Sequence, residues 1–125
     1  VAVFLDCDGT LSEIVSDPEK AFMTPEMREG VREVARLFPT AIVTGRAVPK
    51  VKNFVQLDTV FYAGSHGLDI QGPQETNGRL RERVADRGLR FQPAAQFSGQ
   101  MNAMREELSG LVAGIEGAWV EHNGF

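Results

Sequence analysis

Two carboxylates stand one residue apart, directly after a short apolar run. The run covers residues 1–5, and Asp6 and Asp8 follow it, with Gly9 and Thr10 next. Alternate side chains of an extended chain point the same way, so the two acids share one face. A glycine lets a ligand approach the backbone closely, and the amides of the turn after it can face an anion. The sequence therefore predicts two carboxylates converging on a bound anionic group, in preference to surface acids that only cap a turn.

Three short apolar runs predict the frame that positions these acids. They are residues 1–5, 40–43 and 59–63, each typical of a strand buried in a parallel sheet. Helices are expected between them, one over residues 25–38 with Thr24 as N-cap and a shorter one over residues 49–57. This β-α-β-α-β order predicts an open α/β sheet with right-handed crossovers, whose ligands bind outside the carboxyl ends of the strands.

Further polar candidates follow the second and third runs. Thr44, Gly45 and Arg46 come after residues 40–43, and Ser65 and His66 come after residues 59–63. Because the carboxyl ends of parallel strands meet at one edge of a sheet, these residues are expected to lie beside Asp6 and Asp8.

The chain changes character after Gly72. Residues 74–90 include Asn77-Gly78 and five arginines, and they predict a mobile linker or a weak hairpin whose arginines are solvated. Beyond Pro93, an apolar stripe at helical spacing predicts a helix with a core-facing side, and residues 118–120 are expected to begin a strand. The stripe consists of Phe97, Met101, Met104, Leu108 and Leu111.

Composition narrows the class of protein. The chain of 125 residues is 42% hydrophobic, enough for one globular core, and its net charge of −4 argues against nucleic acid or an anionic membrane as a partner. Cys7, the single cysteine, excludes an internal disulfide and is expected to be a packed thiol. No apolar run approaches the roughly 20 residues that span a bilayer. These features favour a cytoplasmic protein, with a plastid location left open.

Residues 4–12 resemble the first motif of the haloacid dehalogenase superfamily. Other segments narrow the resemblance to the trehalose-6-phosphate phosphatases, especially their plant-type members: residues 17–21, 38–46, 61–70, 91–94 and 120–123. The resemblance implies an α/β fold, a HAD-like open parallel sheet with three of its strands in this chain, followed by the start of a small α+β cap domain. On this reading residues 1–73 are the first half of the core, residues 74–90 are the linker, and residues 91–125 are an incomplete cap domain.

The resemblance also implies roles for the candidate residues. Asp6 is the expected nucleophile, Asp8 the general acid and then base, and Mg²⁺ is held by the Asp6 carboxylate and the Asp8 main-chain carbonyl. The other expected substrate contacts are Gly9, Thr10, Thr44, Gly45, Arg46, Ser65, His66 and Glu121. Plainer interpretations stay open, in which Thr44 caps the next helix, Arg46 pairs with a surface acid, and Ser65 and His66 form a turn hydrogen-bonded to itself.

The implied function is hydrolysis of trehalose 6-phosphate to trehalose and phosphate through an aspartyl-phosphate, in trehalose biosynthesis. The expected partner is a small-molecule sugar phosphate. The family's third-motif Lys or Arg and fourth-motif acid have no counterpart in residues 1–125, so the segment alone is expected to be inactive. Two alternatives stay open, a non-catalytic phosphatase-like regulatory domain and a phosphatase for another sugar phosphate. A signalling receiver domain fits less well, because its acceptor aspartate follows a later strand.

Overall fold

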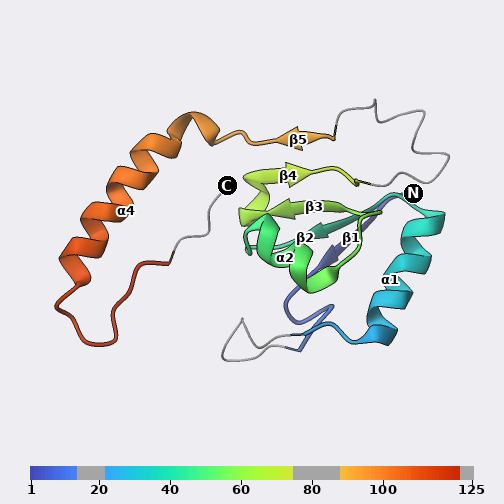
Figure 1. The fold of residues 1–125 in the computed structure, drawn as a ribbon. Helices are drawn as coiled ribbons and strands as arrows, with labels where there is room; N and C mark the ends of the chain where they lie inside the picture. Colours follow the sequence, from blue (N-terminus) through green and yellow to red (C-terminus); the bar gives the residue numbers. More distant parts are fainter. Residues whose placement is uncertain (14–21, 75–87, 122–125) are drawn as a thin grey trace.

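The computed structural model describes residues 1–13, 22–74 and 88–121 (Figure 1). Its elements, in chain order, are β1 (Val3–Asp6), α1 (Pro25–Leu37), β2 (Thr40–Val43), α2 (Val48–Val55), β3 (Phe61–Gly64), the 3-10 turn η2 (Ser65–Gly67), β4 (Asp69–Gln71), β5 (Arg90–Phe91), the 3-10 turn η3 (Ala95–Phe97) and α4 (Ser98–Val112). The α/β class predicted from the alternating runs is confirmed.

One sheet joins the five strands in the order β1-β2-β3-β4-β5 (Figure 1). β1, β2 and β3 are parallel, as predicted, whereas β4 pairs antiparallel with β3 and β5 antiparallel with β4. β4 and β5 were not predicted, because strands of three and two residues are too short to show a periodic pattern. β5 begins at Arg90, the last residue of the predicted linker, and most of that linker, residues 75–87, lies outside the described residues.

The two helices between the parallel strands start and stop for local reasons. Thr24 caps α1 as predicted, since its Oγ1 accepts a hydrogen bond of 3.2 Å from the Met27 amide. α2 ends at Val55, where Gln56 takes the left-handed conformation at φ 56°. The helices are tied together by Arg28, whose Nε donates to the carbonyl of Val55 at 2.8 Å.

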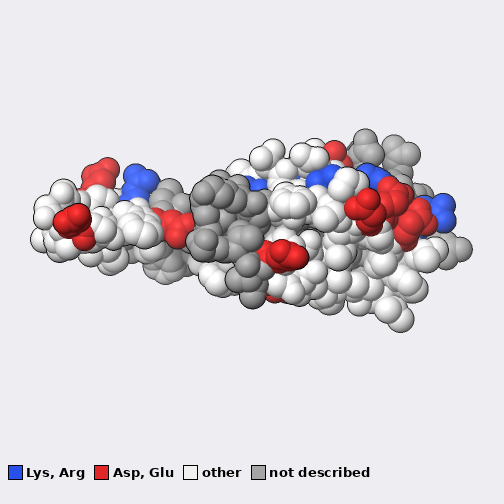
Figure 2. All heavy atoms as spheres, turned by 90° about the horizontal axis from the view of Figure 1, so that it is seen from below, with Lys and Arg blue, Asp and Glu red and all other residues white. Residues whose placement is uncertain are grey.

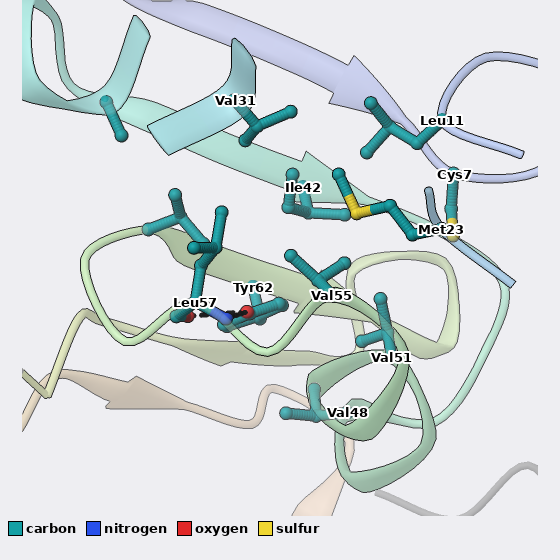
Figure 3. Packing of buried hydrophobic residues seen from close by; sticks show 12 residues of the cluster. Cys7, Leu11, Met23, Val31, Ile42, Val48, Val51, Val55, Leu57 and Tyr62 are labelled. Carbon is teal, nitrogen blue, oxygen red and sulfur yellow. Dashed lines mark hydrogen bonds between the residues drawn. The ribbon is translucent and has the colours of Figure 1, made fainter. Parts of the chain in front are cut away.

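The core lies on one face of the sheet, beneath α1 and α2 (Figure 3). The buried cluster consists of Cys7, Leu11, Met23, Val31, Ala35, Ile42, Val48, Val51, Val55, Leu57, Val60 and Tyr62. Tyr62 is held there by its hydroxyl, which donates to the Leu57 carbonyl at 2.6 Å and accepts from the Leu57 amide at 3.3 Å. On the opposite face Phe4 is 72% exposed and Val43 38% exposed, so the described residues leave that face largely uncovered.

α4 projects away from the sheet (Figures 1 and 2). The predicted helix is confirmed, but the prediction that its apolar stripe is buried is wrong for the described chain, since α4 has no buried residue. The exposed stripe residues are Phe97, Met101, Met104, Leu108 and Leu111. Helical spacing identifies a face suited to burial, but not the element that buries it. Residues 118–120, expected to begin a strand, are in irregular structure.

Charge is mixed along the described surface. In the view of Figure 2, acidic and basic side chains lie together over α1, and no extended basic patch is visible on that face. Within residues 1–13, 22–74 and 88–121, no helix combines the length and apolarity needed to cross a membrane.

Candidate active site

Three loops leave the sheet at one edge. In the sheet register Asp6 pairs with Val43, and Val43 pairs with Ala63, so β1, β2 and β3 end side by side. The loops that follow carry the candidates predicted from the sequence, Asp8 after β1, residues 44–46 after β2 and residues 65–66 after β3. Parallel pairing thus brings together polar residues from three segments that are far apart in the chain.

The loop after β1 keeps the strand's alternation. Asp6 and Asp8 are exposed, while Cys7 between them is fully buried, which confirms the packed thiol. Burial, and after it the neighbouring charge of Asp8, raise the pKa of the Cys7 thiol to about 11. Gly9 then takes a positive φ of 87°, and its amide donates to the Ser12 carbonyl at 2.9 Å. This turn leaves both carboxylates on the open side of the loop.

Asp8 is bound at two points by Arg46. Arg46 Nη2 donates to Asp8 Oδ1 at 2.5 Å, and Arg46 Nε donates to Asp8 Oδ2 at 3.0 Å. The guanidinium also lies 5.4 Å from the centre of the Phe54 ring, close enough for a cation–π contact. One partner of Arg46 is therefore an acid, and this acid belongs to the candidate site itself.

Backbone hydrogen bonds join the loop after β2 to the loop after β3. The Ser65 amide donates to the Arg46 carbonyl at 2.8 Å, and the His66 amide donates to the Thr44 carbonyl at 3.1 Å. Thr44 is buried, and its Oγ1 accepts from the Arg46 amide at 3.1 Å. A hydroxyl that accepts one bond still has a proton to donate, so Thr44 can both shape this loop and bind an anion.

The turn after β3 is strained. Ser65, His66 and Gly67 have φ values of 49°, 55° and 88°, three left-handed residues in a row. Non-glycine residues seldom adopt this conformation, and strain of this kind is often found at ligand sites. Ser65 is buried, whereas His66 is exposed and packs its ring against Gly45. A Cβ at Gly45 would lie 2.6 Å from His66 Cε1, so a side chain there would force the His66 ring to move.

Two predicted site residues stand apart from these contacts. Thr10 is exposed in the turn after Gly9. Glu121 is exposed beyond α4, and among the described residues no hydrogen bond or ion pair joins it to another candidate. The structure thus brings Asp6, Asp8, Thr44–Arg46, Ser65 and His66 together, and their predicted roles stay predictions.

The donor atoms beside Asp6 suit a hard cation. The Asp6 carboxylate is exposed, and in the described chain no backbone amide donates to the Asp8 carbonyl. Oxygen ligands of this kind match Mg²⁺, which commonly binds one or two carboxylates together with substrate phosphate. No cluster of three or more His, Cys, Asp or Glu side chains occurs in the described ranges, so no complete set of protein ligands is found there.

A second polar network was missed by sequence reasoning. Asp69 of β4 is 2% exposed and accepts from Gln71 Nε2 at 3.1 Å, with Arg90 of β5 at 3.5 Å. Lys52 of α2 donates to Gln71 Oε1 at 2.9 Å. The signal available in the sequence was an acid within an apolar segment just after Gly67, but Arg90 and Lys52, which complete the network, lie on other elements. Asp69 is the register partner of Gly64, so the network supports the strand next to the candidate site.

A cleft of about 330 Å³ opens at the opposite edge of the sheet. It is lined by Arg32, Glu33 and Arg36 of α1 and by Gln56, Leu57, Asp58 and Thr59. Residues 56–59 lead into the amino end of β3, so this cleft contains none of the predicted site residues.

Comparison with known proteins gives a consistent result. A family model described as trehalose-phosphatase matches residues 4–125. The whole chain is 51% identical over 127 residues to trehalose-phosphate phosphatase B of Arabidopsis thaliana and covers 33% of that protein. It is 50% identical over 129 residues to the probable trehalose-phosphate phosphatase 3 of Oryza sativa subsp. japonica and covers 35% of it. The chain therefore spans about a third of the length of these relatives.

Solved structures support the fold. A trehalose-6-phosphate phosphatase related protein superposes with a TM-score of 0.72 at 22% identity, over 98% of this chain and 48% of that one. The C-terminal domain of a Candida albicans trehalose-6-phosphate phosphatase gives 0.71 at 17% identity, over 98% and 39%. A haloacid dehalogenase-like hydrolase from B. subtilis gives 0.56 at 16% identity, over 88% and 33%. The arrangement of β1, β2 and β3 is thus that of a HAD-like core.

Proposed function

Because the chain belongs to the trehalose-phosphatase family, we propose that it is the nucleophile-bearing part of an enzyme that hydrolyses trehalose 6-phosphate to trehalose and phosphate. The observation that carries the proposal is the meeting of Asp6 and Asp8 with the Thr44–Arg46 loop at the carboxyl edge of the sheet. Plant relatives about 50% identical over the whole chain, all named trehalose-phosphate phosphatases, support the choice of sugar.

Asp6 is the proposed nucleophile. Its exposed carboxylate attacks phosphorus, a P–O bond to Asp6 forms, and the P–O bond to the sugar breaks, leaving an aspartyl-phosphate. Water then attacks the phosphorus of this intermediate, which releases phosphate and restores the Asp6 carboxylate. Thr44 supports both steps with a hydrogen bond from its hydroxyl to a phosphoryl oxygen. Gly45, which has no side chain, leaves room for the phosphate to approach.

Asp8 is the proposed proton carrier. In the first step its protonated carboxyl gives a proton to the departing sugar oxygen, and in the second its carboxylate accepts one from the attacking water. Its side chain is 46% exposed, which is compatible with access to both substrate and water. Gly9 and Thr10 turn the backbone so that its amides can face the phosphate.

Mg²⁺ fits the oxygen donors at this site. The Asp6 carboxylate and the Asp8 main-chain carbonyl would hold it, and bound there it would neutralise the repulsion between a phosphate and two carboxylates.

We assign the sugar to Ser65 and His66 on the strained turn and to Glu121 beyond α4. In this proposal residues 1–73 are the first half of the core, residues 74–90 a linker and residues 91–125 part of a cap. A free, buried Cys7 supports a reducing compartment, the cytoplasm or a plastid.

Phosphate release by the full-length protein that carries this segment tests the proposal. Trehalose 6-phosphate, sucrose 6-phosphate and glucose 6-phosphate are compared at equal concentration with Mg²⁺. Selective release from trehalose 6-phosphate that disappears in Asp6→Asn is the expected result. Faster release from another sugar phosphate would reassign the substrate. A folded protein that releases none would favour a regulatory, phosphatase-like role.

A further inference from the structure

We propose that Asp69 is a positioning residue for sugar recognition, whose buried carboxylate fixes the strand that supports the strained turn of Ser65 and His66. The inference rests on the proposed function, in which that turn contacts the sugar of trehalose 6-phosphate. It gives a role to a buried charged group that lies outside the set of acids and loop residues assigned to the reaction.

The turn after β3 needs support at both of its ends. Ser65, His66 and Gly67 all take left-handed conformations, and two of them are not glycine. Strain of this kind persists only where the surrounding structure imposes it. On one side, the amides of Ser65 and His66 donate to carbonyls of the loop after β2. On the other side the chain enters β4, whose first residue, Asp69, pairs with Gly64, so the position of β4 sets the second end of the turn.

A polar network holds β4, which lies between β3 and β5 (Figure 1). The Asp69 side chain is 2% exposed and accepts a hydrogen bond of 3.1 Å from Gln71 Nε2. Its two oxygens also face Nε and Nη2 of Arg90 on β5, each at 3.5 Å. Gln71 in turn accepts from Lys52 Nζ of α2 at 2.9 Å, and this ammonium lies 5.6 Å from the centre of the Tyr62 ring. Side chains of α2, β4 and β5 thus fix β4 from both sides.

A buried carboxylate at this position is better explained by geometry than by stability. Removing a carboxylate from water is costly, and replacing a buried ion pair with apolar residues is often neutral or stabilising. What a carboxylate adds is direction, since it is satisfied only when its donors stand at particular places. Here the donors belong to Gln71 and Arg90, which are register partners, so Asp69 holds β4 and β5 in one alignment.

The expected consequence is a loss of sugar binding rather than of phosphoryl transfer. The proposed phosphate contacts follow β1 and β2, whereas β4 and β5 lie beyond β3 in the sheet. A shift of β4 therefore moves the Ser65–His66 turn and leaves β1 and β2 in place. Loss of a contact made equally in the bound substrate and in the transition state raises KM and leaves kcat unchanged.

Two variants of the full-length protein test the inference. Asp69→Asn keeps the size of the side chain but removes its charge, and we expect KM for trehalose 6-phosphate to rise about 5- to 30-fold, the value of one or two neutral hydrogen bonds. Arg90→Gln removes the partner from a half-exposed position and should raise KM at least about 3-fold. In both variants kcat is expected to change by less than about 3-fold.

A substrate without a sugar separates recognition from folding. With p-nitrophenyl phosphate, KM and kcat of both variants are expected to stay within about 3-fold of wild type, because the phosphate contacts are intact. A variant that only lowers the fraction of folded protein would reduce the rate with both substrates alike. In a His66→Ala background, Asp69→Asn should raise KM for trehalose 6-phosphate by a smaller factor than it does alone, because part of the positioned contact is already absent.

Arg36→Gln is the matched control. Arg36 forms a surface ion pair of 3.4 Å with Glu33 on α1, so the variant makes the same chemical change away from β4. Exposed pairs of this kind contribute little, and no change is expected with either substrate. Arg90→Lys, which keeps the charge, should lie closer to wild type than Arg90→Gln.

Equal losses with both substrates, or a fall in kcat at unchanged KM, would overturn the inference. A wild-type KM in Asp69→Asn would also overturn it, as would a wild-type KM in Arg90→Gln should Asp69→Asn fail to fold. These outcomes leave the proposed function standing, since wild type still releases phosphate from trehalose 6-phosphate. A wild-type protein that releases none would contradict the proposed function, and the inference with it.

Discussion

The candidate site depends on the alternation of side chains in three successive residues. Asp6 and Asp8 face outward, and Cys7 packs between them into the core. A shift of the β1 register by one residue would bury a carboxylate, which is strongly unfavourable without a partner. The same alternation that completes the core therefore presents both acids at the edge of the sheet.

The Thr44 hydroxyl has two uses, one observed in the structure and one proposed. Oγ1 accepts from the Arg46 amide, and its proton is proposed to bind a phosphoryl oxygen. Thr44→Val removes both, and we expect kcat/KM for trehalose 6-phosphate in the full-length protein to fall roughly 10- to 100-fold, the value of a hydrogen bond to a charged group. Thr44→Ser is the matched control and should stay within a few-fold of wild type. A Val variant as active as the Ser variant would show that the hydroxyl binds no phosphate.

Tyr62 gives the protein a predictable response to alkaline pH. Burial raises its pKa from 10 to about 12, so the folded state holds the phenol proton more tightly than the unfolded state. Its contribution to stability is therefore complete below pH 10 and is lost as pH rises towards 12. The loss corresponds to about 3 kcal/mol at the usual 1.36 kcal/mol per pKa unit.

Tyr62→Phe tests this response in the full-length protein. At neutral pH we expect a lower free energy of unfolding by about 1–3 kcal/mol, because the backbone groups of Leu57 lose their partner. Urea unfolding at pH 7 to 11.5 should show this difference shrinking above pH 10. A difference that stays constant across that range would contradict the assigned pKa shift.

At the scale of elements, the parallel part of the fold was predictable because its signals are local. Each buried strand is a continuous apolar run, and α1 carries its own N-cap in Thr24. The carboxyl-edge rule then placed Thr44 and Ser65 beside the two acids before any contact was known. Only chain order and strand direction were needed for that step.

What the sequence did not reveal are pairs between distant elements. Asp8, one partner of Arg46, lies 38 residues away in the chain, and only the structure shows that contact. β4 and β5 depend on pairing rather than on pattern, as does the burial of Asp69. The apolar face of α4 was predicted from its spacing, but spacing alone does not predict whether another element covers that face.

The packing of β3 against the start of α2 gives a prediction at this scale. A Cβ at Gly64 would lie 2.8 Å from the Arg46 carbonyl oxygen and 2.9 Å from the Val48 amide nitrogen, and backbone cannot move aside cheaply. Gly64→Ala in the full-length protein is expected to lower the free energy of unfolding by about 1–3 kcal/mol.

Gly30→Ala is its control. Nothing lies within 4 Å of a Cβ at Gly30, inside α1, so that variant should be up to about 1 kcal/mol more stable through helix propensity. Urea unfolding of the two variants gives the comparison. Equal stabilities would show that β3 and α2 are less tightly packed than described.

At the scale of the whole molecule, the part of the chain that the structure describes leaves apolar surface open in two places. Phe4 and Val43 lie on the sheet face away from α1 and α2, and the stripe on α4 is exposed along its length. Sheets with parallel strands normally have both faces covered. The relatives are about three times as long as the chain, which is consistent with further polypeptide covering these surfaces in the full-length protein.

This incompleteness predicts the behaviour of the segment by itself. Residues 1–125 produced alone are expected to hydrolyse trehalose 6-phosphate at least about 1,000-fold more slowly than the full-length protein. The family's third-motif Lys or Arg and fourth-motif acid have no counterpart in this segment, and electrostatic groups of this kind each raise kcat by a factor on the order of 10²–10³. Phosphate release at equal molar concentration measures the ratio. A segment that works at a comparable rate would show that the described residues already contain the complete site.

The central claim is that Asp6 carries the phosphoryl group, and trapping the intermediate tests it most directly. The full-length protein is mixed with trehalose 6-phosphate, quenched in acid within a single turnover and reduced with borohydride, which converts an aspartyl-phosphate to homoserine. Mass spectrometry of the peptide containing Asp6 reads out the position. We predict homoserine at position 6 in wild type and none in Asp6→Asn. Phosphate release without modification at Asp6, or homoserine at another aspartate, would contradict the account.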